Sequence, residues 1–162
     1  MLFSASRWYF LQYMIEIDEI DERILRELGS DGRVSNSELS SRVGLSASAC
    51  LRRVQELERL GIIKGYRAII DHSLLGVNFS AYISVGLSVH TKKSQRAFEK
   101  AIVQSPEVIE CHNVTGSFEY LLRVETKDLA AYKVFHTDIL GTLPQVNSIS
   151  TYVVMESPKD NR

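Results

Sequence analysis

Apolar residues in the first 60 positions recur at helical spacing in three stretches, each bounded by residues that are common at helix ends. The first stretch runs from Ile17 to Leu28, and Gly29 is its stop signal. The second begins at Ser35, three residues before Glu38. This spacing predicts a capping box, in which each side chain accepts a hydrogen bond from the backbone amide of the other residue. The patterns predict two helices, the second ending near residue 43.

A third helix is predicted directly after the second. Gly44 permits a tight turn, and Ser46 is a suitable N-cap for the third helix. Gly61 is expected to end this helix, and its core-facing stripe would consist of Leu51, Val54, Leu57 and Leu60. Two short helices joined by a glycine-containing turn are typical of the helix-turn-helix.

Beyond Gly61 the pattern becomes one of strands and helices. Residues 62–70 are expected to form two short strands around Lys64 and Gly65, a small wing, and residues 71–78 a linker. Strand-like and helix-like stretches follow in the order strand, helix, strand, strand, helix, strand, at residues 80–89, 93–104, 108–114, 120–125, 129–140 and 146–155. This order predicts an α+β, ferredoxin-like fold, with two helices on one face of a four-stranded antiparallel sheet.

The chain is therefore expected to contain two domains. We assign residues 14–70 to a winged helix-turn-helix domain, residues 79–156 to a ferredoxin-like βαββαβ domain and residues 157–162 to a C-terminal tail. Residues 1–13 are aromatic and almost uncharged, unlike the rest of the chain. We interpret them as an extension, either loosely attached or the product of a misassigned start. The alternative is an arm that packs on a partner subunit.

Composition is that of a soluble globular protein, with 44% hydrophobic and 24% charged residues among 162. Cys50 and Cys111 form no CxxC pair, which favours a reducing compartment over a disulfide framework. Cys50 is expected to be a small apolar residue of the third helix; the alternative is a thiol redox switch. No apolar run approaches the roughly 18 residues needed to span a bilayer. We expect a cytoplasmic protein without a membrane partner.

The net charge of −1 conceals an uneven distribution. Between Arg42 and Arg67 six basic residues accompany two acidic ones, a local charge of +4. Between Glu16 and Asp31 seven acidic residues accompany two basic ones, a local charge of −5. A basic stretch beside an acidic one suits a surface that meets phosphate on one side only.

The third helix is the candidate for contact with double-stranded DNA. Its first turn carries small side chains that allow close approach to base edges in a major groove, namely Ser46, Ala47, Ser48 and Ala49. Arg52 and Arg53 are expected to contact phosphate or guanine. Lys64 and Arg67 are expected to add contacts to the DNA backbone from the wing. The alternative is a purely structural helix pair with a solvated charged face; the turn, the caps, the local charge and the wing together favour DNA binding.

Longer runs of residues in both domains resemble one known family. These runs are Ile20-Asp21, Ile24-Leu25, Gly32 to Leu39, Arg42 to Ser46, Cys50 to Val54, Leu57 to Ile63, Glu110 to Leu122 and Thr151 to Glu156. They are similar to the Lrp/AsnC, or feast/famine, family of transcriptional regulators, and most similar to its leucine-responsive members. The resemblance covers about residues 14–156.

This resemblance implies a winged helix-turn-helix followed by a ligand-binding and oligomerisation domain of the type called RAM. It also implies homodimers that assemble further, often into octamers, and an amino acid, leucine-like here, that binds between subunits and modulates DNA binding. By position, the effector-binding residues would be Thr115, Gly116, Ser117, Phe118, Glu119 and Tyr120, with a neighbouring subunit closing the site near Tyr152, Val153 and Val154. Gly116 would let backbone amides turn toward a carboxylate, and a carboxylate side chain can pair with an α-ammonium group.

The sequence departs from the family pattern in two respects. Glu119 stands where relatives commonly carry Asp, and its extra methylene changes the reach of a contact to an α-amino group. This leaves the identity of the effector open. Ala47 and Ala49 stand where relatives often have Pro, which exchanges a rigid helix start for better helix propensity. We expect docking on DNA to survive this exchange.

No constellation of residues predicts catalysis, a metal site or a cofactor. The histidines lack partners at metal-ligand spacing; they are His72, His90, His112 and His136. Cys111 and His112 are adjacent, so in a strand they point to opposite faces and form no nucleophile–base pair. We therefore expect that the chain is not an enzyme. The competing hypothesis is a ligand-binding or enzymatic α+β domain whose helical N-terminus serves only for dimerisation.

Overall fold

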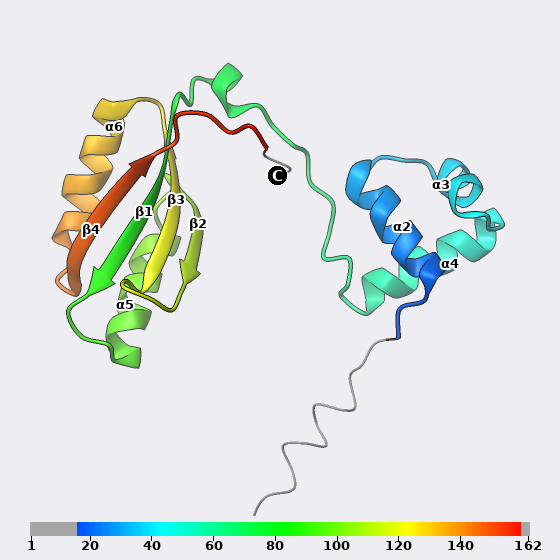
Figure 1. Cartoon of the computed structure of the whole chain (residues 1–162), viewed down its shortest axis with the longest axis horizontal. Coiled ribbons are helices and arrows are strands. Elements are labelled where there is room, and N and C mark those ends of the chain that lie inside the picture. The colour runs from blue at the N-terminus through cyan, green and yellow to red at the C-terminus, as the bar shows by residue number, and fades with distance from the viewer. Residues whose placement is uncertain (1–15, 160–162) are drawn as a thin grey trace, which may run out of the picture. The chain divides into compact units, whose positions relative to one another are not determined.

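The computed structural model describes residues 16–159 and divides the chain into two compact units after Ala68 (Figure 1). The first unit contains helices, and the second contains a sheet with helices. This confirms the predicted α+β class, with the helix-turn-helix preceding the sheet domain. The predicted extension at residues 1–13 and residues 160–162 of the predicted tail lie outside the described residues.

Three helices build the first unit, namely α2 (Glu19–Ser30), α3 (Asn36–Val43) and α4 (Ala47–Arg59). Helix α2 begins with a complete capping box, in which Asp18 accepts from the Asp21 amide and Asp21 accepts from the Asp18 amide. Apolar side chains from all three helices are buried together and form the core of this unit: Ile24, Leu39, Val43, Cys50 and Leu57. Cys50 is fully buried, which confirms its predicted role as a small apolar residue.

Three local predictions for this unit are wrong. Helix α2 continues through Gly29 to Ser30 before it ends. Ser35 caps α3 by accepting from the Glu38 amide, but the Glu38 carboxylate pairs with Arg42 instead of completing a capping box. The predicted stripe on α4 is rotated by about one residue, because Cys50 is buried and Leu51 is 46% exposed.

The two short strands predicted around Lys64 and Gly65 are not formed: residues 62–70 contain no strand. An isolated two-stranded hairpin is at best marginally stable unless one face is buried. Here Ile69 and Ile70 are 76% and 55% exposed, so packing supplies no such burial. Gly65 also has φ 149°, which interrupts the extended backbone at the predicted hairpin.

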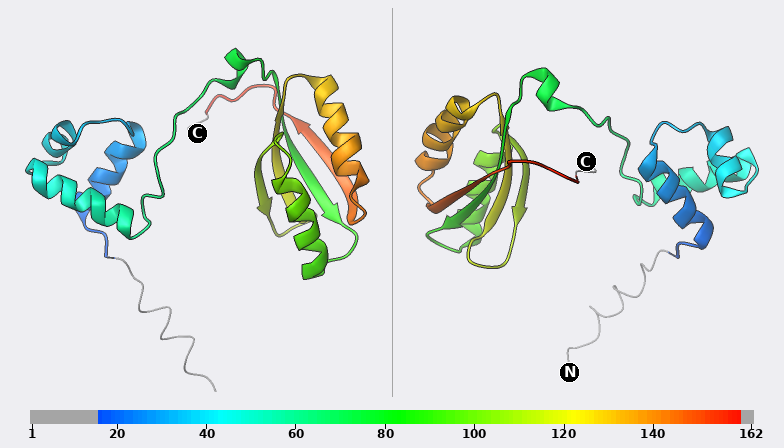
Figure 2. Two further views of the ribbon diagram at one scale, coloured as in Figure 1. Left: turned by 180° about the vertical axis from the view of Figure 1, so that it is seen from behind. Right: turned by 45° about the horizontal axis from the view of Figure 1, so that its top comes forward.

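The second unit is a four-stranded antiparallel sheet with the order β2-β3-β1-β4. Its strands are β1 (Phe79–Leu87), β2 (Val108–Asn113), β3 (Tyr120–Thr126) and β4 (Val146–Val153). Helix α5 (Lys92–Val103) follows β1 and helix α6 (Leu129–Val134) follows β3. Both helices cover the same face of the sheet (Figure 2). This arrangement confirms the predicted βαββαβ fold.

Short helical turns extend this framework. The second unit begins at Ile69, and its first helical turn is the 3₁₀ helix η1 (His72–Leu75), within residues predicted to be a linker. After α6 the chain continues as the π-helical turn η2 (Phe135–Ile139) and the 3₁₀ turn η3 (Leu140–Thr142). The core of the second unit lies between the sheet and the two helices, where alternate residues of β1 and β3 meet Phe98 and Ile102 of α5.

Candidate DNA-binding helix and effector site

The turn between α3 and α4 is fixed by hydrogen bonds. Gly44 adopts the left-handed conformation with φ 74°, and the Ser40 carbonyl accepts from the amides of Gly44 and Leu45. The Asn36 side-chain amide donates to the carbonyl of Ala47 at 2.8 Å, which ties the start of α3 to the start of α4. The orientation of α4 relative to α3 is therefore set by local contacts, as a DNA-reading helix requires.

Helix α4 presents one exposed face along its length. Of the predicted first-turn contacts, Ser46, Ala47 and Ser48 are exposed, and Ala49 is half-buried. The Ser46 hydroxyl accepts from the Ala49 amide at 3.3 Å, so it caps the helix. Farther along, the same side of the helix carries exposed residues at helical spacing from Ser48, namely Leu51, Arg52 and Gln55.

Sequence reasoning missed Leu51 and Gln55 as surface residues of α4. Leu51 was assigned to the core stripe, although its neighbour Cys50 takes that place. Gln55 lies three residues after Arg52 and seven after Ser48, a spacing that places these side chains on one helical face. That spacing was available in the sequence and could have identified Gln55.

Arg53 is bound to α2 and its cap. Its Nη1 lies 2.7 Å from Asp18 Oδ2 and 2.8 Å from Asp21 Oδ1. The Asp21 backbone amide, and next the Arg53 guanidinium, lower the pKa of the Asp18 carboxyl. These ion pairs connect the capping box of α2 to α4, so Arg53 contributes to packing within the unit.

The basic residues of this unit divide into paired and unpaired groups. Arg42 pairs with Glu27 and Glu38 at 2.8 and 2.7 Å, and Arg59 pairs with Glu56 at 2.6 Å. Within residues 16–159, the cations from the predicted DNA-binding set that enter no ion pair are Arg52, Lys64 and Arg67. The local charge of +4 is therefore partly neutralised within the unit.

The predicted effector loop connects β2 to β3 and is folded back by backbone hydrogen bonds. Val114 donates to the carbonyl of Glu119 at 2.8 Å, and the Glu119 amide donates to the Val85 carbonyl at 3.1 Å. Gly116, at the exposed tip of the loop, has φ 148°. Thr115 and Ser117 are also exposed, and Phe118 is half-buried. The loop thus presents backbone and small polar groups at the end of the sheet.

The Glu119 carboxylate is the charged group of this loop. Its Oε2 accepts from the Leu87 amide at 2.6 Å, and its Oε1 lies 3.1 Å from Nδ1 of His90. The Glu119 side chain is 20% exposed and the His90 side chain 68% exposed. The additional methylene of Glu119 therefore lets the carboxylate reach the end of β1. Sequence reasoning missed His90 in this role, because no local signal relates it to a residue 29 positions away.

Tyr120 faces the helix layer of the domain. It is 1% exposed, its ring lies 4.5 Å from that of Phe98, and its hydroxyl donates to Glu99 Oε1 at 2.8 Å. Burial, and next the hydrogen bond to Glu99, raise the pKa of Tyr120 to about 12. Its side chain therefore belongs to the core, whereas that of its neighbour Glu119 contacts Leu87 and His90.

The second group of predicted effector residues lies at the far end of β1. The pairing register sets Tyr120 opposite Val85 and Val153 opposite Ala81. Four residues of strand separate these positions, or about 13 Å at roughly 3.3 Å per residue. Tyr152 and Val153 are 57% and 53% exposed, and Val154 is half-buried. The two predicted groups thus do not come together within one chain.

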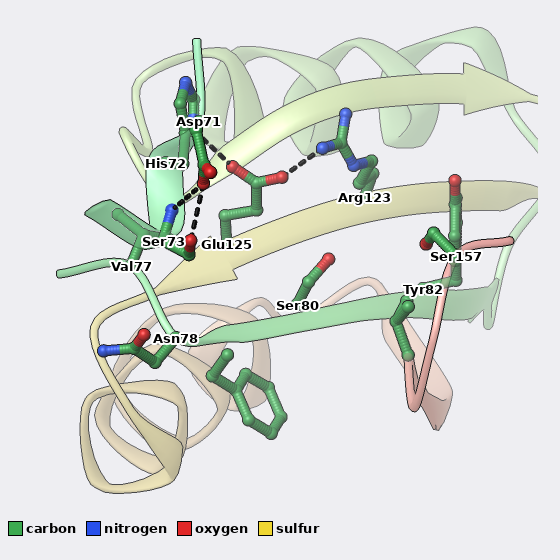
Figure 3. Close-up of a pocket in the computed structure, with 12 residues that line it drawn as sticks. Asp71, His72, Ser73, Val77, Asn78, Ser80, Tyr82, Arg123, Glu125 and Ser157 are labelled. Atoms are coloured by element: carbon green, nitrogen blue, oxygen red, sulfur yellow. Dashed lines mark hydrogen bonds and ion pairs between the residues drawn. The ribbon is translucent and has the colours of Figure 1, made fainter. Parts of the chain in front are cut away.

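An open cleft of about 580 Å³ lies on the sheet face opposite the helices, beneath η1 and the C-terminal segment (Figure 3). Polar and charged groups line much of it. Glu125 is central: its Oε2 lies 2.7 Å from Nδ1 of His72, and its Oε1 pairs with Arg123. Arg123 also lies 3.3 Å from Glu110. Of the predicted effector residues, Val154 lines this cleft.

The described residues were also compared with the requirements of metal binding, thiol chemistry and membrane insertion. Between residues 16 and 159 no three side chains of His, Cys, Asp or Glu are grouped to hold a metal ion. Burial raises the pKa of both the Cys50 and the Cys111 thiol, which lowers their reactivity at neutral pH. In the same residues no helix is long and apolar enough to cross a membrane.

Comparisons with known proteins agree with this geometry. Residues 17–64 match the family model for winged helix-turn-helix DNA-binding, and residues 80–162 match that for the Lrp/AsnC ligand binding domain. The leucine-responsive regulatory proteins of Klebsiella pneumoniae and Escherichia coli are each 42% identical over 146 residues, which cover 90% of this chain and 89% of theirs.

Solved structures show the same fold over most of the chain. A transcriptional regulator from Neisseria meningitidis, in complex with L-Met, has a TM-score of 0.85 and 33% identity, covering 90% of this chain and 94% of its own. An AsnC family regulator from Agrobacterium tumefaciens has a TM-score of 0.83 and 30% identity, covering 89% and 94%.

A helix-turn-helix unit joined to a ligand-binding α+β unit defines a DNA-binding transcriptional regulator. The matches cover both units, and the chain belongs to the Lrp/AsnC family. It is an Lrp-type regulator with a ligand-binding domain.

Proposed function

We propose that this protein is a homo-oligomeric regulator that reads double-stranded DNA with α4 and whose DNA binding is modulated by an amino acid. The observation that carries the DNA-binding part is the division of α4 into two faces. Cys50 and Leu57 are buried against α2 and α3, whereas Ser48, Arg52 and Gln55 are exposed. A helix anchored on one side and free on the other can enter a major groove.

On DNA, the first turn of α4 and Arg52 take different roles. Ser48 is small enough for close approach to base edges, and Leu51 offers an apolar contact suited to a thymine methyl group. Arg52 contacts guanine or phosphate, because its charge is not engaged by an acidic side chain of residues 16–159. Lys64 and Arg67 follow α4 and contact the DNA backbone. Arg53 acts mainly through its ion pairs with Asp18 and Asp21.

The effector site uses the loop from Thr115 to Glu119. Thr115, Gly116 and Ser117 supply exposed polar groups for an α-carboxylate, and the Glu119 carboxylate pairs with an α-ammonium group. Tyr120 supports this loop from the core. The relative from Neisseria meningitidis, solved with L-Met, supports an amino acid as the ligand class. The similarity to leucine-responsive proteins favours a leucine-like side chain.

A second copy of the chain completes this site. Tyr152, Val153 and Val154 lie about four strand residues from the loop along β1 in the same chain, so they close the site only from a neighbouring subunit. Homodimers that assemble into octamers satisfy this requirement. Symmetric dimers also match a near-palindromic DNA site.

Thermal-shift screening of the twenty amino acids tests the sensing part. A ligand at about 100 times its dissociation constant stabilises the folded state by about 2.7 kcal/mol. We expect L-leucine or a similar apolar amino acid to raise the unfolding midpoint. If no amino acid shifts the midpoint, an amino-acid effector is contradicted. A gel-shift assay with genomic fragments tests DNA binding separately, and no enrichment of particular fragments at low salt would contradict it.

A further inference from the structure

The Glu119 carboxylate has one oxygen turned toward the backbone and one toward solvent. The inner oxygen, Oε2, accepts from the Leu87 amide at 2.6 Å. The pairing of β1 with β4 shifts register between Gly86 and Leu87. A β-bulge of this kind re-aims backbone groups, and here the Leu87 amide donates to a side chain. The bulge therefore fixes the inner half of the carboxylate.

Gly86 keeps this corner of the site compact. A Cβ at Gly86 would overlap the Ser148 hydroxyl and would lie 3.8 Å from Glu119 Oε2. The Glu119 carboxylate, the end of β1 and the side chain of Ser148 on β4 therefore lie close together.

The outer oxygen, Oε1, is covered by His90. The His90 Nδ1 lies 3.1 Å from Oε1, within ion-pair distance of the carboxylate. His90 follows β1 in a loop and its side chain is 68% exposed, whereas that of Glu119 is 20% exposed. The imidazole therefore stands on the solvent side of the carboxylate, where an α-ammonium group would approach.

The charges around His90 influence the strength of its ion pair with Glu119. Glu119 is the one ion-pair partner of His90 among residues 16–159. Ser148 and the backbone of β1 are uncharged. Lys92 and Lys93, in the first turn of α5, are the next cations along the chain and enter no ion pair within the described residues. A protonated imidazole thus pairs more strongly with Glu119 than a neutral one does.

We propose that His90 is a specificity-determining residue of the effector site, which occupies the outer oxygen of Glu119 until the α-ammonium group of an amino acid displaces it. This inference rests on the proposed function of Glu119. Imidazolium and ammonium compete for the same carboxylate oxygen. Effector affinity therefore rises as His90 loses its proton, and the pH at which the regulator responds depends on a residue outside the effector loop.

Calorimetric titration of the full-length chain with L-leucine at about pH 6 and about pH 8 tests this inference. We expect the wild-type chain to bind L-leucine about fivefold more weakly at the lower pH. In His90→Asn the affinity at the lower pH should rise, and the two affinities should agree within about twofold. His112→Asn is the matched control: His112 also contacts a glutamate, Glu110 at 3.4 Å, and should leave the pH dependence unchanged.

The outcomes separate the inference from the function on which it rests. If the wild-type chain binds L-leucine and His90→Asn keeps the wild-type pH dependence, His90 does not compete for Glu119, although the effector site stands. If the wild-type chain binds L-leucine at neither pH, the proposed leucine-like effector fails, and the role of His90 fails with it.

Discussion

Arg53 on α4 forms an ion pair of 2.8 Å with Asp21 on α2, and the Asp21 carboxylate in turn accepts from the Asp18 amide at the start of α2. Contact of this guanidinium with DNA would require both of its partly exposed ion pairs to break. The two adjacent arginines of α4 therefore have different roles, and their substitutions should have different consequences.

Replacement of Arg53 should reduce stability more than DNA affinity. We expect Arg53→Ala to lower the free energy of unfolding by about 1 kcal/mol, the upper end for a partly exposed ion pair. Because Asp21 shares the interaction, Asp21→Asn combined with Arg53→Ala should cost less than the sum of the two single changes. Urea unfolding of the four proteins measures this coupling. Additive costs would show that the ion pair contributes nothing.

Replacement of Arg52 should have the opposite profile. We expect Arg52→Ala to leave the unfolding midpoint unchanged and to weaken DNA binding. If Arg52 contacts phosphate, the slope of log affinity against log salt should fall by about 0.9. Lys100→Ala on α5 removes one exposed positive charge elsewhere and is the control. Equal salt slopes for Arg52→Ala and the wild type would contradict a phosphate contact.

Two leucines of α4 test which face of the helix meets DNA. Leu57 is 3% exposed and Leu51 is 46% exposed. We expect Leu57→Ala to lower the free energy of unfolding by about 2 to 5 kcal/mol, as for other core truncations. Leu51→Ala should leave stability almost unchanged and weaken binding to specific sites more than to random DNA. A large loss of stability in Leu51→Ala would show that Leu51 is a core residue and would contradict this prediction.

The phenol of Tyr120 should lose its proton at a higher pH than an ordinary tyrosine does. Its pKa is raised from 10.0 to about 12, chiefly by burial and then by Glu99. A raised pKa means that the folded state favours the neutral phenol, so this contribution is complete below pH 10.0 and is lost as the pH rises toward about 12. Absorbance titration near pH 11 should show fewer phenolates in the folded wild type than after unfolding, and Tyr120→Phe should reduce this difference; the pKa of Tyr66 is also raised, so Tyr66 contributes to what remains. Ionisation of Tyr120 with the ordinary tyrosine pKa of 10.0 would contradict its burial.

The elements with strong periodicity or clear end signals could be predicted from the sequence. Ser46 caps α4, Gly44 makes the turn, and the βαββαβ order follows from alternating patterns. The wing could not be predicted reliably, because alternation in residues 62–70 says nothing about whether a partner covers Ile69 and Ile70.

The candidate site was predictable only in part, for the same physical reason. The Glu119 position follows from similarity along the chain, but its contacts with Leu87 and His90 depend on the register of the sheet. Likewise, Arg52 and Arg53 are equivalent in a charge pattern and differ by about 100° around the helix, which directs one to solvent and the other to Asp21.

The most direct test of the proposed coupling between effector and DNA is fluorescence anisotropy with a labelled fragment from the region upstream of the protein's own gene. The titration would use the wild-type chain and Glu119→Gln, each with and without L-leucine. Glu119→Gln keeps an oxygen that can accept from the Leu87 amide but removes the negative charge. We predict that L-leucine changes the DNA affinity of the wild type by about fivefold or more and leaves that of Glu119→Gln unchanged. Equal responses of the two proteins to L-leucine, or no response of the wild type, would contradict the proposed effector site.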